Sequence, residues 1–237
     1  IARKQPKTAH SLPLVAPDLG SDSVRAMAAR RIAPDLFEVL GVEERAHKVS
    51  NICVEHGIIT QSSSAGYLIA EVLKLLANRI GVYELPTAFV SIGGYSMQIA
   101  AVHSRRDQAR KKEISQQLLD DMELECKHKI ELRNTEVAVL GLVPSYFVLD
   151  GQEQDEIPNS TQRATMVEAH YTAFCGRKMI DTQLQKAFSQ AARSIEHAFV
   201  KPETLLSVFA TCDGNEVLMD GCAVLDLGAQ TTSLAVY

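Results

Sequence analysis

The sequence predicts an α/β protein, with an α+β mixed sheet flanked by helices. Two observations support this fold class. Runs rich in β-branched residues recur along the chain, and apolar stripes with helical spacing lie between them. The early strand-like runs follow one another without an intervening helix, which is typical of a meander rather than of strict βαβ alternation.

Seven segments have the composition of strands. They are residues 12–16, 23–29, 37–42, 87–92, 136–149, 165–174 and 222–227. Three further segments have apolar residues at helical spacing, and each stripe is expected to face the core. The first stripe contains Leu68, Val72, Leu75, Leu76 and Ile80; the second contains Ile114, Leu118, Met122 and Cys126; the third contains Ile180, Leu184, Ala187, Phe188, Ala191, Ile195 and Phe199.

The composition is that of a globular protein. The 237 residues are 46% hydrophobic and 22% charged, which excludes disordered, collagen-like and coiled-coil chains. The net charge of −5 argues against nucleic-acid binding, which requires a basic face. Five scattered cysteines without a CxxC pair indicate a reducing compartment. No apolar run reaches about 18 residues and residues 1–10 lack the apolar part of a signal peptide, so we expect neither a membrane span nor export.

The two ends of the chain carry a near-repeat. Residues 14–26 (LVAPDLGSDSVRA) and 223–235 (AVLDLGAQTTSLA) both contain an apolar strand, Asp-Leu-Gly, small hydroxyl residues and a second apolar strand. Glycine lets backbone N–H groups approach a phosphate, hydroxyls add donors, and the Asp can hold a hydrated divalent cation. Either copy alone is also a common β-turn. Two copies facing one another would clamp the phosphates of a nucleotide.

The paired hairpins resemble the phosphate loops of the superfamily of actin, sugar kinases and heat-shock ATPases. Within it, the chain is most similar to the family of the bacterial cell-division protein FtsA, with ordered matches from about residue 14 to 237. The matching segments are 37–42 (FEVLGV), 56–59 (HGII), 90–96 (VSIGGYS), 113–115 (EIS), 142–151 (LVPSYFVLDG), 157–159 (IPN) and 168–172 (EAHYT).

The resemblance implies an actin-like, ribonuclease-H-like lobe with an inserted small subdomain of the FtsA type, called 1C. Residues 1–95 would begin subdomain 1A, 96–177 would form subdomain 1C, 178–221 would return to 1A, and 222–237 would be the first hairpin of the second lobe. The stretch 201–207 (KPETLLS) resembles the segment that connects the two lobes. Because the rest of the second lobe is missing, we expect the sequence to be part of a longer protein.

The resemblance also implies a function. FtsA-like proteins bind ATP, polymerise into filaments at the inner face of the cell membrane, anchor the FtsZ ring and recruit other division proteins. Membrane contact would use a C-terminal helix that is absent here. The complete protein is expected to have at most weak ATPase activity, this chain alone none, and no catalytic residue is assigned. The residues implied to hold ATP are Asp18, Gly20, Ser21, Ser23, Asp226, Gly228, Gln230, Thr231 and Thr232, with Asp18 and Asp226 holding Mg²⁺ through water.

Some residues depart from the family pattern. Ala229 and Gln230 stand where the family has Gly-Gly, Ser233 replaces an Asp, and Pro17 and Asp22 flank the first turn. These departures favour an alternative, a non-enzymatic actin-like adaptor of the PilM type that serves type IV pilus assembly as a docking surface. A sugar kinase is a more distant alternative, since no segment resembles a sugar-binding motif.

Other candidate sites are weaker. Residues 94–98 lack the second glycine of a nucleophile elbow around Ser96. Cys126 and His128 lie close in sequence but are expected on opposite faces of a helix, which disfavours a metal site. The basic residues of segment 105–112 are expected in a solvated loop between a strand and a helix, with contact to a partner or to anionic lipid as the alternative.

Overall fold

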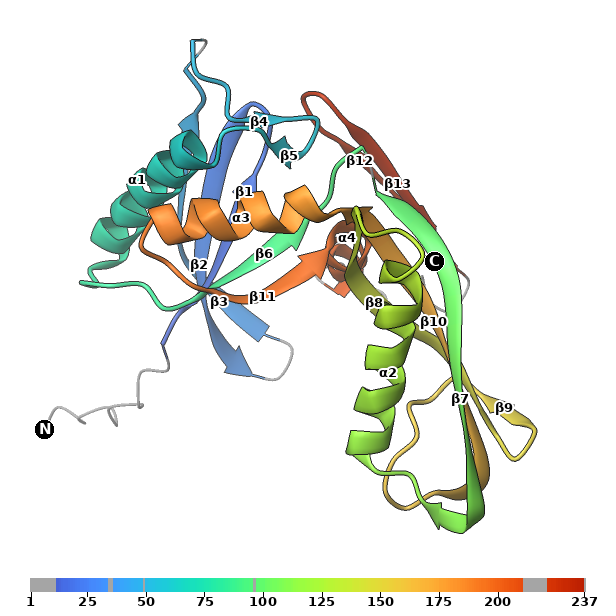
Figure 1. The fold of residues 1–237 in the computed structure, drawn as a ribbon. Coiled ribbons are helices and arrows are strands. Elements are labelled where there is room, and N and C mark those ends of the chain that lie inside the picture. Colours follow the sequence, from blue (N-terminus) through green and yellow to red (C-terminus); the bar gives the residue numbers. More distant parts are fainter. Residues whose placement is uncertain (1–11, 34–35, 49, 96, 211–220, 237) are drawn as a thin grey trace, which may run out of the picture. The chain divides into compact units, whose positions relative to one another are not determined.

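The computed structural model describes residues 12–33, 36–48, 50–95, 97–210 and 221–236, with the side chains of 206–210 left out (Figure 1). The chain divides into two compact units. The first is built from Ile1–Tyr95 and Thr182–Tyr237, and the second from Ser96–Asp181. The second unit is therefore an insertion into the first. That this insertion is a subdomain of the 1C type stays a prediction.

The first unit contains a mixed five-stranded sheet with the order β11-β6-β1-β2-β3 (Figure 1). Its strands are β1 (Leu14–Leu19), β2 (Ser23–Ala33), β3 (Leu36–Ala46), β6 (Ala88–Ile92) and β11 (Ile195–Val200). The first three form an antiparallel meander, while β6 and β11 run parallel to β1. The predicted mixed sheet and meander are confirmed.

Pro17 lies inside β1, although β1 is the central strand of the sheet. A central strand donates hydrogen bonds to neighbouring strands on both sides, and proline has no N–H to donate. The pairing of β1 with β6 is limited to Val15 and Ala88, whereas Pro17 is paired with Ala26 on the β2 side. The short β6 ladder explains how the sheet accommodates this proline.

Helix α1 (Ser62–Ile80) covers β2 and β3 and packs against α3 (Lys178–Gln190). Its buried stripe includes Ile69, Val72 and Leu76. The helix ends at Gly81, whose φ of 72° is the left-handed conformation of a C-cap glycine. Two short hairpins complete the unit, β4 (Val54–Glu55) with β5 (Ile58–Ile59), and β12 (Ala223–Leu227) with β13 (Thr232–Val236).

The third predicted helical stripe is too long. Helix α3 ends at Gln190, and Ala192 has a positive φ of 52° in the turn that follows. Ile195 and Phe199 belong instead to β11, which pairs with β6. Residues four apart lie on one face of a strand as well as of a helix, so this spacing does not distinguish the two. The connecting segment after it forms a short helix, α4 (Lys201–Ala210).

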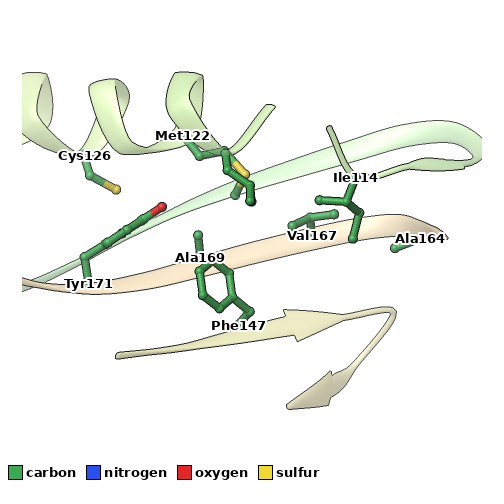
Figure 2. Packing of buried hydrophobic residues seen from close by; sticks show 9 residues of the cluster. Ile114, Met122, Cys126, Phe147, Ala164, Val167, Ala169 and Tyr171 are labelled. Carbon is green, nitrogen blue, oxygen red and sulfur yellow. The ribbon is translucent and has the colours of Figure 1, made fainter. Parts of the chain in front are cut away.

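The second unit contains an antiparallel sheet with the order β7-β10-β8-β9, helix α2 (Gln116–Glu131) and the first residues of α3. The strands are β7 (Gln98–Glu113), β8 (Val137–Leu149), β9 (Gln152–Gln154) and β10 (Arg163–Arg177). Figure 2 shows Met122 and Cys126 of α2 pointing toward Val167, Ala169 and Tyr171 of β10. Burial of alternate residues of β10 under the amphipathic face of α2 makes this core.

The basic segment 105–112 is part of strand β7, so its prediction as a loop was wrong. Its side chains have acidic partners on neighbouring positions. Arg105 pairs with Asp107 and Glu168, Arg106 with Glu125, and Lys111 with Asp150. Glu168 lies opposite Arg105 on β10, while Glu125 is on α2 and Asp150 follows β8, so the strand's positive charges are balanced by partners from several elements.

Within the described ranges, no helix is long and apolar enough to cross a membrane. The described cysteines are free thiols.

Candidate functional site

The two Asp-Leu-Gly turns close with the same hydrogen bond. The N–H of Gly20 donates to the carbonyl of Ser23 at 3.0 Å, and the N–H of Gly228 donates to the carbonyl of Thr231 at 2.9 Å. A Cβ atom at either glycine would lie 3.0 Å or less from that same carbonyl oxygen. Both turns therefore require glycine for the same steric reason, and the near-repeat in the sequence is also a repeat in structure.

A cavity of about 670 Å³ in the first unit is lined by residues of both turns. Its wall also includes Phe89, Phe199, Lys201 and Thr204, from β6, β11 and α4. The predicted site residues that line it are Asp18, Gly20, Ser21, Ser23, Asp226, Gly228 and Thr231. The fold thus brings together residues from opposite ends of the chain, while Gln230 and Thr232 are not part of the lining. That any of them binds ATP stays a prediction.

His47 braces the first turn. Its backbone N–H donates to the carbonyl of Asp22 at 2.9 Å, and its Nε2 donates to the carbonyl of Gly20 at 2.9 Å. Because a carbonyl oxygen only accepts, Nε2 carries the hydrogen and Nδ1 of the neutral ring is an acceptor. The Sγ atom of Cys53 lies 3.4 Å from Nδ1, and burial raises the pKa of this thiol, so the thiol is the donor.

The Ser23 side chain has a partner on β3. Its hydroxyl donates to Oε1 of Glu44 at 2.6 Å, and Nε of Arg25 donates to the same oxygen at 2.8 Å. These hydrogen bonds, that of Ser23 first, lower the pKa of Glu44, and the bond to Glu44 raises the pKa of Arg25. The Ser23 hydroxyl and the Arg25 guanidinium are therefore engaged in this arrangement.

The turn between β4 and β5 contacts both Asp-Leu-Gly turns. The N–H of His56 donates to Oε1 of Gln230 at 2.8 Å, and the N–H of Gly57 donates to the hydroxyl of Ser21 at 3.5 Å. His56 and Gly57 have positive φ angles of 50° and 76°, which aim their successive N–H groups at these acceptors. Gln230, predicted as a phosphate ligand, thus holds its hairpin against this turn.

Lys201 was missed by sequence reasoning. Its Nζ lies 2.5 Å from Oδ2 of Asp226, and both residues line the cavity. The sequence placed Lys201 only in a connecting segment, since no local pattern indicates a pairing with a residue so far along the chain. The only feature of the sequence that could have indicated a role for Lys201 is its position between the end of a strand and the start of a helix.

The residues present fit a phosphate group. Two glycine turns border the cavity, and the ammonium of Lys201 supplies a positive charge. In the described part of the chain, the N–H groups of Ser21, Asp22 and Ala229 donate to no other protein atom. Such N–H groups in a glycine turn form the anion-binding surface that phosphates use.

The same residues do not fit Mg²⁺ in the predicted way, because the Asp226 carboxylate already has Lys201 as its partner. The residues that the structure describes also contain no cluster of three or more His, Cys, Asp or Glu side chains able to hold a metal ion. Cys126 and His128 do not meet, since Cys126 is fully buried and His128 is exposed. Burial raises the pKa of the Cys126 thiol to about 11, and Ser96 lies outside the described residues.

Comparison with known proteins identifies the fold. No family model matches the sequence, and no curated protein matches it. Among solved structures, the chain is similar to one in a PilM-PilN type IV pilus biogenesis complex, with a TM-score of 0.62 and 13% sequence identity. The match covers 94% of this chain and 57% of that chain. The chain thus has an actin-like fold and spans little more than half the length of that neighbour.

Proposed function

We propose that this chain is the phosphate-binding part of an actin-like, ATP-binding protein that acts in bacterial cell division as FtsA does. One observation carries the proposal: two glycine turns with the same closing hydrogen bond border one cavity. Anions bind where several backbone N–H groups converge, and the triphosphate of ATP needs such groups on both of its sides.

Within the cavity, the two turns would hold the phosphates from opposite sides. The hydroxyls of Ser21 and Thr231 would add donors to the backbone N–H groups, and Lys201 would offset negative charge. Phe89 and Phe199 give the cavity an apolar wall, which excludes water and strengthens these interactions. Because ATP would contact both turns at once, its binding would stabilise the arrangement in which the two hairpins face each other across the cavity.

The wider role rests on the resemblance to FtsA. We propose that the complete protein self-associates at the inner face of the cell membrane, binds FtsZ and recruits further division proteins. The Mg²⁺ that the sequence predicts at Asp18 and Asp226 is not part of this proposal, because the Asp226 carboxylate is paired with Lys201. The acidic net charge of −5 supports protein rather than nucleic-acid partners.

ATP titration by calorimetry tests the phosphate site. Wild-type protein is expected to bind ATP, and Gly228→Ala is expected to weaken binding at least about tenfold, since the added Cβ would lie 2.9 Å from the Thr231 carbonyl oxygen and distort the second turn. Asp155→Ala is the matched control, because Asp155 is exposed in the other unit. Equal affinities of wild type and Gly228→Ala would contradict the proposed clamp.

An adaptor of the PilM type is the second candidate. The similar chain in the PilM-PilN complex favours it, as does the Asp226 carboxylate that is already neutralised by Lys201. Pull-down experiments with purified FtsZ and with a PilN-type cytoplasmic peptide separate the two candidates. Binding of FtsZ alone supports the division role, and binding of the peptide alone supports the adaptor.

A further inference from the structure

The ion pair between Lys201 and Asp226 lies inside the candidate site. Nζ and Oδ2 are 2.5 Å apart, and the side chains are only 28% and 33% exposed. Both residues line the cavity that the two glycine turns share. An ion pair in a partly buried setting is stronger than one on an open surface, because water screens it less.

The start of α4 fixes the position of Lys201. The Thr204 hydroxyl donates to the Lys201 carbonyl at 2.9 Å, and the Glu203 carboxylate accepts from the N–H of Val200 at 2.9 Å. The Lys201 side chain also lies over Gly93, where an added Cβ would come within 3.1 Å of its Cδ. Because the backbone and the side-chain stem are both held, the ammonium is directed to one place.

Among the described residues, Lys201 is the cation of the cavity whose carboxylate partner, Asp226, also lines it. Arg25 also lines the cavity, but its guanidinium is bound to Glu44. Mg²⁺ binds proteins mainly through carboxylate oxygens and would have to compete with the Lys201 ammonium for Asp226. The ammonium has three N–H donors, and its ion pair with Asp226 is the one polar contact that the described part of the chain gives it.

We propose that Lys201 takes the place of a divalent cation in this site, so that a di- or triphosphate binds without metal. Asp226 orients the ammonium, and its remaining donors bind phosphate oxygens. The ligand class is therefore a metal-free polyphosphate chain, either of a nucleotide or free. This inference rests on the proposed phosphate site and specifies how its charge is balanced.

Binding measured with and without Mg²⁺ tests the proposal. The purified chain is titrated with ATP and with tripolyphosphate by calorimetry, in EDTA and in excess MgCl₂. The affinity in EDTA is expected to stay within about threefold of that in MgCl₂, since a tenfold loss would need about 1.4 kcal/mol from the metal. A nucleotide as the natural ligand predicts tighter binding of ATP, and a free polyphosphate predicts equal binding.

Two variants distinguish phosphate binding through the Lys201 ammonium from phosphate binding through Mg²⁺. Lys201→Met should lose at least about tenfold in EDTA and regain part of it with MgCl₂, because the exposed Asp226 carboxylate then repels phosphate unless a metal bridges them. Asp226→Asn should keep or improve binding in EDTA, since it releases Lys201, whereas a metal site would lose its ligand. Lys74→Met is the matched control, because Lys74 is exposed on α1.

Each outcome is decisive. Mg²⁺-dependent wild-type binding that is lost in Asp226→Asn would overturn the inference and leave the proposed function standing. Absence of binding in both buffers would overturn both. Circular dichroism confirms that each variant is folded, and if Lys201→Met is not, Asp226→Asn still distinguishes the mechanisms.

Discussion

Gln230 accepts, through Oε1, a 2.8 Å hydrogen bond from the backbone N–H of His56, and its carbonyl oxygen lies 3.4 Å from Nδ1 of the same histidine. The contact joins the turn of the last hairpin to the turn between β4 and β5. A glycine at this position, which the FtsA-like pattern predicts, would have no side chain to accept from the His56 N–H. Because its side chain binds His56, Gln230 is not part of the cavity lining.

Replacement of Gln230 should therefore loosen the hairpin. Gln230→Gly removes the acceptor for His56, and a single exposed hydrogen bond of this kind contributes about 0.5–1.5 kcal/mol. Exchange of the His56 amide hydrogen, followed by NMR, is expected to accelerate about three- to tenfold. Gln152→Gly, at an exposed position of β9, is the control. An unchanged exchange rate would show that the contact does not hold the hairpin.

The crossing of α1 and α3 depends on Gly66. A Cβ at this position would lie 2.6 Å from Cβ of Gln190 and 2.7 Å from the carbonyl oxygen of Ala187. Overpacking costs about 1–3 kcal/mol, which exceeds the roughly 1 kcal/mol that alanine gains over glycine in a helix. Gly66→Ala is expected to lower the free energy of unfolding in urea. Ser63→Ala, exposed on the same helix, should change it by less than about 0.5 kcal/mol.

Asp150 makes the second unit sensitive to acid. Its Oδ1 accepts from the Thr165 hydroxyl and from the N–H groups of Met166 and Thr165, and these bonds lower its pKa from 3.8 to about 2. A lowered pKa means that the contribution to stability is complete above pH 3.8 and is lost as the pH falls through about 2. Asp150→Asn should lower the melting temperature at pH 7, with a difference that shrinks as the pH falls toward about 2.

Thermal unfolding between pH 7 and pH 2, followed by circular dichroism, measures this difference. Asp155→Asn serves as the control, since Asp155 is an exposed residue of the same unit. A difference that persists unchanged at the lowest pH would contradict the assignment to the Asp150 charge.

His47 should affect ligand affinity through the first turn. His47→Ala removes the donor to the Gly20 carbonyl and leaves that turn less ordered, so the affinity for tripolyphosphate is expected to fall about three- to tenfold. His47→Gln retains an N–H donor and should recover part of the loss. His128→Ala, exposed on α2, is the control. Equal affinity for all four proteins would argue against a role of His47 in ordering the turn.

The sequence predicted most strands because local composition determines them where a sheet face is buried. The sequence-based prediction was wrong where partners that are distant in sequence determine the secondary structure. Strand β7 has a loop-like charged composition, and Glu168 and Glu125, which stabilise it, are remote in sequence. Strand β11 was assigned to a helix because so short an apolar segment fits either period, and only its pairing with β6 decides.

The part of the candidate site that the sequence predicted is the pair of repeated Asp-Leu-Gly turns. Asp18 and Asp226 each stand two residues before a turn glycine, and the fold brings both turns to one cavity. The side-chain partners were not predictable, because they come from other elements. Glu44 for Ser23, His56 for Gln230 and Lys201 for Asp226 are set by how the strands pack, which no local spacing encodes.

The insertion of the second unit between β6 and β11 has a consequence for synthesis on the ribosome. Strand β6 emerges well before β11, its parallel neighbour, while Ser96–Asp181 is continuous and can fold as soon as it leaves the exit tunnel. Until β11 is translated, the side of β6 that faces β11 has no partner strand and can pair with other chains. Nascent chains arrested within the insertion should thus aggregate through β6 more readily than chains arrested after β11.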